Sequence, residues 1–102
     1  MEKDKKGSKK TPTISQEALD HLGRKIDSLG DPDLVVERSG RYCYVRHGAS
    51  PLCRLGYRGE LEIWDFAIYK YSTQSYSTQE MFPSRGTVAD LVGMAMNAYN
   101  LR

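Results

Sequence analysis

The stretch from residue 52 to residue 71 constrains the fold of this chain more than any other part. It contains the single tryptophan, Trp64, one of the two phenylalanines, Phe66, and three of the seven tyrosines. Runs of alternating aromatic and branched side chains are typical of strands, and we interpret the stretch as two of them, residues 52–57 and 60–71. Both faces of the second strand are apolar in the middle, which predicts a central strand of a sheet.

Two amphipathic helices are predicted on either side of the strand region. Apolar side chains recur every three or four residues along residues 15–29 and again along residues 87–101, so each helix has one apolar face. Ser15 and Thr87 stand at the N-cap positions of these helices, and Gly30 is expected to end the first.

Two shorter strands, residues 33–37 and 41–46, are predicted before the central pair, with a tight turn at Ser39-Gly40. The second of them alternates between an apolar face and a face of aromatic and basic side chains. The apolar face carries Cys43 and Val45, and the other carries Tyr42, Tyr44 and Arg46.

The remaining connections are predicted as turns and loops. Residues 48–51 are expected to form a loop, and Arg58-Gly59 is expected to form a hairpin turn. In the third strand we expect Leu52 on the same face as Arg54. The polar residues 72–84 are either a loop or a short fifth strand around Tyr76.

This order of elements predicts an α+β fold. The expected architecture is a four-stranded antiparallel sheet, or a five-stranded one if Tyr76 lies in a strand, with both helices packed on one face. We expect one domain, residues 13–102, preceded by a disordered lysine-rich tail, residues 1–12, which holds five lysines.

Charge and hydropathy restrict the setting in which the chain works. The formal net charge is +2, but the lysine-rich tail alone carries +3, so the domain is close to neutral. No apolar run is long enough to cross a bilayer or to serve as a secretion signal, so we expect no membrane partner. A cytoplasmic protein with reduced thiols at Cys43 and Cys53 is the resulting expectation.

Neither a metal site nor an enzyme active site is predicted. Cys43, His47 and Cys53 have the spacing C-x3-H-x5-C, but a structural zinc site takes four ligands, and His21 is far away on the first helix. We therefore interpret both cysteines as buried structural thiols. No glycine-rich phosphate loop and no nucleophile with its base can be recognised, so we expect no cofactor and no enzyme.

The acidic side chains near the central strand are expected to be paired with arginines. Asp65 lies in the middle of that strand, where a buried carboxylate requires a partner from the second or third strand. Glu60 and Glu62 are expected to be exposed at a strand end and paired with Arg58 or Arg54.

Arginine interleaved with tyrosine is the feature most suggestive of binding. Both residue types are enriched at protein interfaces, and together they also bind single-stranded nucleic acid by stacking and phosphate neutralisation. The candidate residues for binding a protein partner or nucleic acid are Arg41, Tyr42, Tyr44, Arg46, Arg54 and Arg58.

The last helix has a second candidate contact surface, because its only charge is Asp90. Small and soft side chains on its outward side suit contact with a second copy of the chain. The candidate dimer contacts are Met94, Asn97 and Ala98.

We therefore expect a small non-enzymatic binding module that self-associates and binds a protein, with nucleic-acid binding through the lysine tail and the arginines as the alternative. The order of helix, strands and helix is similar to that of a double-stranded-RNA-binding domain. In such domains a lysine cluster opens the last helix, and here that position reads Thr87-Val88-Ala89-Asp90. The motifs therefore assign the chain to no family.

Overall fold

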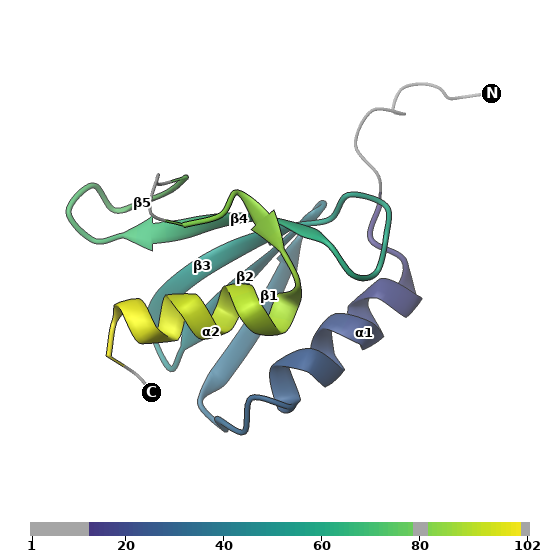
Figure 1. Ribbon diagram of the computed structural model, residues 1–102, viewed down its shortest axis with the longest axis horizontal. Coiled ribbons are helices and arrows are strands. Elements are labelled where there is room, and N and C mark those ends of the chain that lie inside the picture. The colour runs from purple at the N-terminus through teal and green to yellow at the C-terminus, as the bar shows by residue number, and fades with distance from the viewer. Residues whose placement is uncertain (1–12, 79–81, 101–102) are drawn as a thin grey trace.

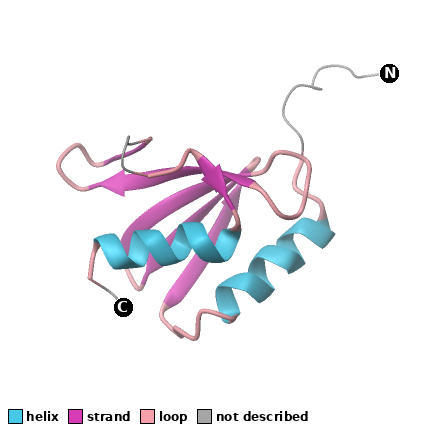
Figure 2. Ribbon diagram, viewed as in Figure 1, coloured by secondary structure: helices cyan, strands magenta, loops and turns pink. Residues whose placement is uncertain are grey.

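The computed structural model describes residues 13–78 and 82–100 of the chain. It has an α+β fold, in which two helices pack against one face of an antiparallel sheet (Figures 1 and 2). The sheet order is β1-β2-β3-β4-β5, and β6 also pairs with β4. The predicted fold class is thus confirmed, while the predicted lysine-rich tail lies outside the described residues.

The fifth strand, one of the two alternatives for residues 72–84, is present, and a sixth strand of two residues was not expected. In chain order the elements are α1 (Gln16–Asp27), β1 (Leu34–Ser39), β2 (Tyr42–His47), β3 (Ser50–Gly56), β4 (Trp64–Lys70), β5 (Ser75–Ser77), β6 (Arg85–Gly86) and α2 (Val88–Ala98).

Helix α1 begins where its sequence predicts and ends at Asp27, two residues before the predicted end. The Ser15 side chain accepts a hydrogen bond from the Ala18 backbone N–H at 3.1 Å, which satisfies one of the unpaired donors of the first turn. Gly30 follows the helix with a φ of +76°, a left-handed conformation that glycine adopts without steric cost. Leu22 and Ile26 turn the apolar face of the helix into the core.

Strands β1, β2 and β3 form two hairpins with two-residue turns. Gly40 and Gly48 have φ values of +62° and +61° in these turns, as primed hairpin turns require. Because His47 pairs with Ser50, strand β3 begins at Ser50, and the prediction of a loop over residues 48–51 was wrong. The predicted alternation of β2 is confirmed, since Cys43 and Val45 are fully buried on its core face.

A β-bulge interrupts the pairing of β2 with β3. Val45 pairs with Cys53 and Arg46 pairs with Pro51, so Leu52 is an extra residue on β3. The bulge turns Leu52 into the core beside Cys53, and both side chains are buried. The expectation that Leu52 shares a face with Arg54 was therefore wrong.

Strand β4 is central, as predicted, because it pairs with β3 on one edge and with β5 and β6 on the other. It begins at Trp64 instead of Glu60, and a loop over residues 57–63 replaces the predicted tight turn. Trp64 Nε1 donates a hydrogen bond to the Leu61 carbonyl at 2.9 Å, which holds the chain back on itself ahead of the strand. The alternating apolar residues of this loop have the same spacing as those of a strand, which is why the predicted strand began too early.

The core lies between the helices and the sheet. Thr87 caps helix α2 by accepting a hydrogen bond from the Asp90 backbone N–H at 3.3 Å, as predicted. The helix buries Leu91 and Met96 against the sheet, while Trp64 is fully buried opposite them. Within the described residues, no helix is both long and apolar enough to cross a membrane. The other side of the sheet, here called the outer face, is covered by no helix of the described residues (Figure 2).

Candidate binding surface on the outer face of the sheet

The pairing of the strands determines which side chains meet on the outer face. One row across the sheet joins Tyr42, Gly56 and Asp65, and the next joins Tyr44, Arg54 and Ala67. Tyr69 and Tyr76 pair further along β4 and β5. Because alternate residues of a strand share a face, these side chains form one surface across four strands.

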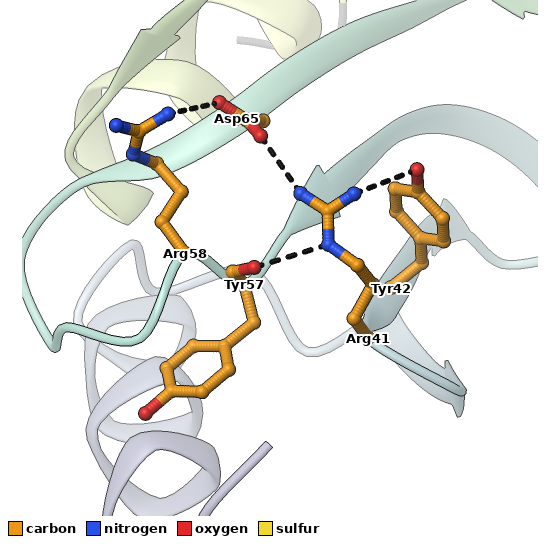
Figure 3. Close-up of polar contacts among 5 residues, drawn as sticks. All are labelled: Arg41, Tyr42, Tyr57, Arg58 and Asp65. Atoms are coloured by element: carbon orange, nitrogen blue, oxygen red, sulfur yellow. Dashed lines mark hydrogen bonds and ion pairs between the residues drawn. The ribbon is translucent and has the colours of Figure 1, made fainter. Parts of the chain in front are cut away.

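An arginine–aspartate cluster occupies one end of this surface (Figure 3). Arg41 Nη2 donates to Asp65 Oδ2 at 2.8 Å, and Arg58 Nη1 donates to Asp65 Oδ1 at 3.1 Å. Arg41 also donates to the Tyr57 carbonyl at 3.1 Å and to the Tyr42 hydroxyl at 2.9 Å. The predicted pairing of Asp65 with an arginine is confirmed, and the carboxylate has a separate arginine on each oxygen.

Gly56 leaves the space that this cluster needs. A Cβ atom at position 56 would lie 3.1 Å from Arg41 Nη2, 3.2 Å from Asp65 Cβ and 3.2 Å from Tyr42 Cε1. These distances are shorter than comfortable van der Waals contact, so a larger residue would push the guanidinium away from its carboxylate.

Arg54 is held by aromatic rings instead of by carboxylates. Its guanidinium carbon lies 4.5 Å from the ring centroid of Tyr42 and 5.7 Å from that of Tyr76. Both distances are in the range of cation–π attraction. In the part of the chain that the structure describes, the Arg54 side chain makes no ion pair, so its guanidinium N–H donors have no carboxylate partner there.

Six of the seven tyrosines form a continuous series of ring contacts that extends beyond the sheet. Neighbouring centroids lie between 4.8 and 6.3 Å apart, and most pairs meet edge to face, the preferred geometry for aromatic rings. The hydroxyl of Tyr99, the residue that follows α2, donates to the Tyr69 carbonyl. Burial raises the pKa of the Tyr76 hydroxyl above its ordinary value. The series runs through Tyr42, Tyr44, Tyr76, Tyr69, Tyr71 and Tyr99.

A cleft of about 260 Å³ opens between these groups. Arg41, Tyr42 and Arg54 line it, and the small residues Gly56 and Ala67 leave its space unfilled. Thr78 and Ser84 also line it.

The predicted binding residues do not all belong to this site. Three of them, Arg41, Tyr42 and Arg54, line the cleft. Tyr44 contacts the ring of Tyr42, and Arg58 is joined to Arg41 through Asp65. Arg46 instead extends towards Glu37 on β1, with 3.6 Å between Nη2 and Oε2.

Sequence reasoning missed Tyr69 and Tyr76 as members of the surface. Tyr69 could have been found from its two-residue spacing to Ala67 and Asp65 along β4. Tyr76 could not, because its position depends on the pairing of β5 with β4. The expected pairing of Glu62 with a strand arginine was wrong, since Glu62 lies 3.9 Å from His21, and Arg58 is bound to Asp65.

The cysteines lie on the core face, away from the outer face. Cys43 and Cys53 are fully buried free thiols, as the sequence predicts. Burial raises the pKa of Cys43 to about 11 and raises that of Cys53 further. His47 is separate from both and makes a 3.0 Å hydrogen bond to Asp31.

Among the described residues one group has the spacing of metal ligands. Ligand atoms of Asp31, Asp33 and His47 all lie within 4.8 Å of one another, at the ends of β1 and β2. Two carboxylates and an imidazole could hold a divalent cation. The ion pair between His47 and Asp31 explains the same arrangement without one.

The candidate dimer contacts lie together on helix α2. Phe82, Met94, Asn97 and Ala98 line a shallow groove of about 510 Å³ on the exposed side of the helix. Met94 is half-buried, whereas Asn97 and Ala98 are exposed.

No protein-family model, curated protein or solved structure matches this chain. The fold and the outer face together define a small α+β domain whose uncovered sheet surface combines a ring-held arginine, an arginine–aspartate cluster and packed tyrosines. Such a surface can bind planar or anionic groups by hydrogen bonds, ion pairing and ring contacts.

Proposed function

We propose that the protein is a non-enzymatic binding module that recognises a protein partner through the outer face of its sheet. The observation that carries this proposal is the guanidinium of Arg54, positioned by the rings of Tyr42 and Tyr76 and without an ion pair in the described residues. An arginine held in this way loses little side-chain entropy on binding, and arginine and tyrosine are the residues most often found in interface hot spots.

The ring geometry favours a protein partner over single-stranded nucleic acid. Bases stack on open aromatic faces, but Arg41 and Arg54 both lie over the Tyr42 ring, at 4.7 and 4.5 Å. Tyr76 contacts the rings of Tyr44 and Tyr69 at 5.2 and 5.0 Å. These rings hold arginine and one another, so they offer less surface to a base.

The test is a selection of displayed random peptides on the immobilised full-length protein. We expect an enriched group of peptides whose binding is lost in Arg54→Gln and in Tyr76→Ala, because both changes remove the ring-held guanidinium. Asp20→Asn, an exposed change on α1 away from the sheet, is the control and should leave binding unchanged.

Two results would contradict the proposal. One is the absence of any enriched peptide, and the other is a set of peptides that bind all the variants equally. An oligonucleotide titration of the same protein at low salt tests the alternative function, nucleic-acid binding. If the oligonucleotide binds, its binding falls steeply with added salt and it depends on Arg54, then the ligand of the outer face is nucleic acid and not a peptide.

A second candidate function, self-association, is favoured by the groove on helix α2. Its lining by Phe82, Met94 and Ala98 is apolar, and Asp90 is the only charge on the helix. Met94→Asp would place a charge in a contact between two copies, so we expect it to convert a dimer to a monomer in light scattering. Wild-type protein that remains monomeric at high concentration would refute this second function.

A further inference from the structure

We infer that the cleft beside Arg54 binds a single anionic oxygen group, a phosphate or a carboxylate, carried by the partner. This inference deepens the proposed function and rests on it, because it names the chemical group that the outer face recognises. The cleft has a volume of about 260 Å³, and Arg54 is the cation in its lining that lacks an ion pair in the described residues.

The two lining arginines have different roles. Arg41 already donates to three acceptors, the Tyr57 carbonyl, the Tyr42 hydroxyl and Asp65, so it supports the wall of the cleft. Arg54 has only ring contacts in the described residues, and its planar fork of N–H donors can bind two oxygens of one anion.

The charge balance around the cleft favours an anion in spite of Asp65. Arg41 and Arg58 each hold one oxygen of that carboxylate, at 2.8 and 3.1 Å. Counted over the described residues of the cleft lining and the Asp65 cluster, Arg41, Arg54 and Arg58 supply three guanidinium groups against one carboxylate, a sum of +2. An entering anion therefore meets an excess of positive charge at short range.

Hydroxyl groups complete the donor set. The Tyr42 oxygen accepts a hydrogen bond from Arg41, which leaves its own O–H free to act as a donor. Thr78 and Ser84, two residues whose side chains bear hydroxyl groups, are also in the lining. Guanidinium and hydroxyl donors around one small cleft are the chemistry that recognises phosphate and carboxylate oxygens.

The inference is tested by NMR on the full-length protein, with inorganic phosphate and acetate as the two probes. The arginine Nε–Hε signals report directly on each guanidinium. We expect the Arg54 signal to shift and saturate with phosphate, and to do so at lower concentration than with acetate, because phosphate carries more charge.

Three variants make the result specific. Arg54→Gln should weaken phosphate binding about tenfold or more, which corresponds to at least about 1.4 kcal/mol. Arg54→Lys keeps the charge but not the planar fork, so it should give an intermediate loss. Arg38→Gln removes the same charge from an exposed position on edge strand β1 and should change the affinity less than about twofold. Unchanged backbone spectra establish that each variant is folded.

Equal losses in Arg54→Gln and Arg38→Gln would overturn the inference, because the attraction would then be a general effect of net charge. A phosphate-induced shift confined to other arginines would also overturn it. Two peptides that are identical except for a phosphoserine in one and a glutamate in the other distinguish a phosphate from a carboxylate as the bound group. At least one of these peptides must bind the Arg54→Gln variant more weakly than the wild-type protein.

The outcome is distinguishable from failure of the proposed function. If the selected peptides bind the outer face but need no anionic side chain, the anion site is refuted and the proposed binding module still stands. If phosphate binds at Arg54 but the selection enriches no peptide, the anion site stands and the proposal of a protein partner is refuted.

Discussion

Gly56 and Asp65 show how single residues build the outer face. The Arg41 side chain lies over position 56 where it contacts Asp65, and even a methyl group at that position would lie 3.1 Å from the guanidinium. Asp65 then fixes Arg41 and Arg58 together at one end of the surface. The local sequence predicts the ion pair of Asp65, but the need for glycine at position 56 follows only from the register of three strands.

Gly56→Ala should lower the free energy of unfolding by about 1–2 kcal/mol, since the new methyl group crowds Arg41, Tyr42 and Asp65. Urea denaturation measures the change. Gly23→Ala is the matched control, because a Cβ there meets nothing within 4 Å in the middle of a helix. It should raise stability by about 0.5–1 kcal/mol, and two changes of the same sign would contradict the steric explanation.

Asp65→Asn should destabilise the fold by about 1 kcal/mol, because the amide keeps one acceptor oxygen and places an NH2 donor where the second arginine needs an acceptor, at a partly exposed site. Glu37→Gln removes the longer 3.6 Å contact to Arg46 at a more exposed position and should cost less than about 0.5 kcal/mol. Chemical denaturation of both variants gives the comparison. An equal cost would show that the Asp65 cluster adds no more stability than a surface ion pair.

At the scale of elements, sequence patterns that lie within a single helix or strand predicted that element correctly. Both helices and their N-caps were found from spacing and capping residues, and the alternation of β2 was found from its two faces. The bulge at Leu52, the late start of β4 and the two-residue strand β6 were missed. Each of these depends on contacts with a neighbouring strand or loop, which spacing along the chain does not specify.

Ser15→Ala should destabilise the protein by about 1 kcal/mol, because the Ala18 N–H loses its acceptor at the start of α1. Thermal unfolding followed by circular dichroism measures the effect. Ser28→Ala, at the other end of the same helix, removes an exposed hydroxyl that bonds only to the Lys25 carbonyl. Its effect should stay below about 0.5 kcal/mol, and an equal effect of the two changes would contradict the capping role of Ser15.

At the scale of the whole molecule, the outer face is assembled from segments far apart in the sequence. Arg41 precedes β2, Arg54 is on β3, and Tyr76 is on β5. The predicted sheet with two helices on one face was sufficient to expect a tyrosine and arginine surface opposite them. It was not sufficient to separate the ring-held Arg54 from Arg46, because that difference depends on neighbours from other strands.

The buried thiols should make the folded protein less stable at alkaline pH. The pKa of Cys43 rises from 9.0 to about 11 on folding, and that of Cys53 is raised as well, so the unfolded chain loses protons first as the pH rises. Stability is therefore retained below pH 9 and falls as the pH rises above it, at up to about 1.4 kcal/mol per pH unit for each thiol. The loss from Cys43 is complete near pH 11, and that from Cys53 continues above it.

Urea midpoints recorded from pH 7 to pH 10 measure this loss. The double variant Cys43→Ala, Cys53→Ala is the control, because it should be less stable at neutral pH but should show a smaller decline above pH 9. An unchanged alkaline decline in this variant would show that other groups cause it.

The most direct test of the outer face as the binding surface is a backbone amide NMR map of the full-length protein with a peptide from the display selection. We predict that the largest shifts fall on the outer-face rows around Tyr42, Arg54, Ala67 and Tyr76, with α1 unaffected. Shifts confined to α1 and α2, with these rows unchanged, would contradict it.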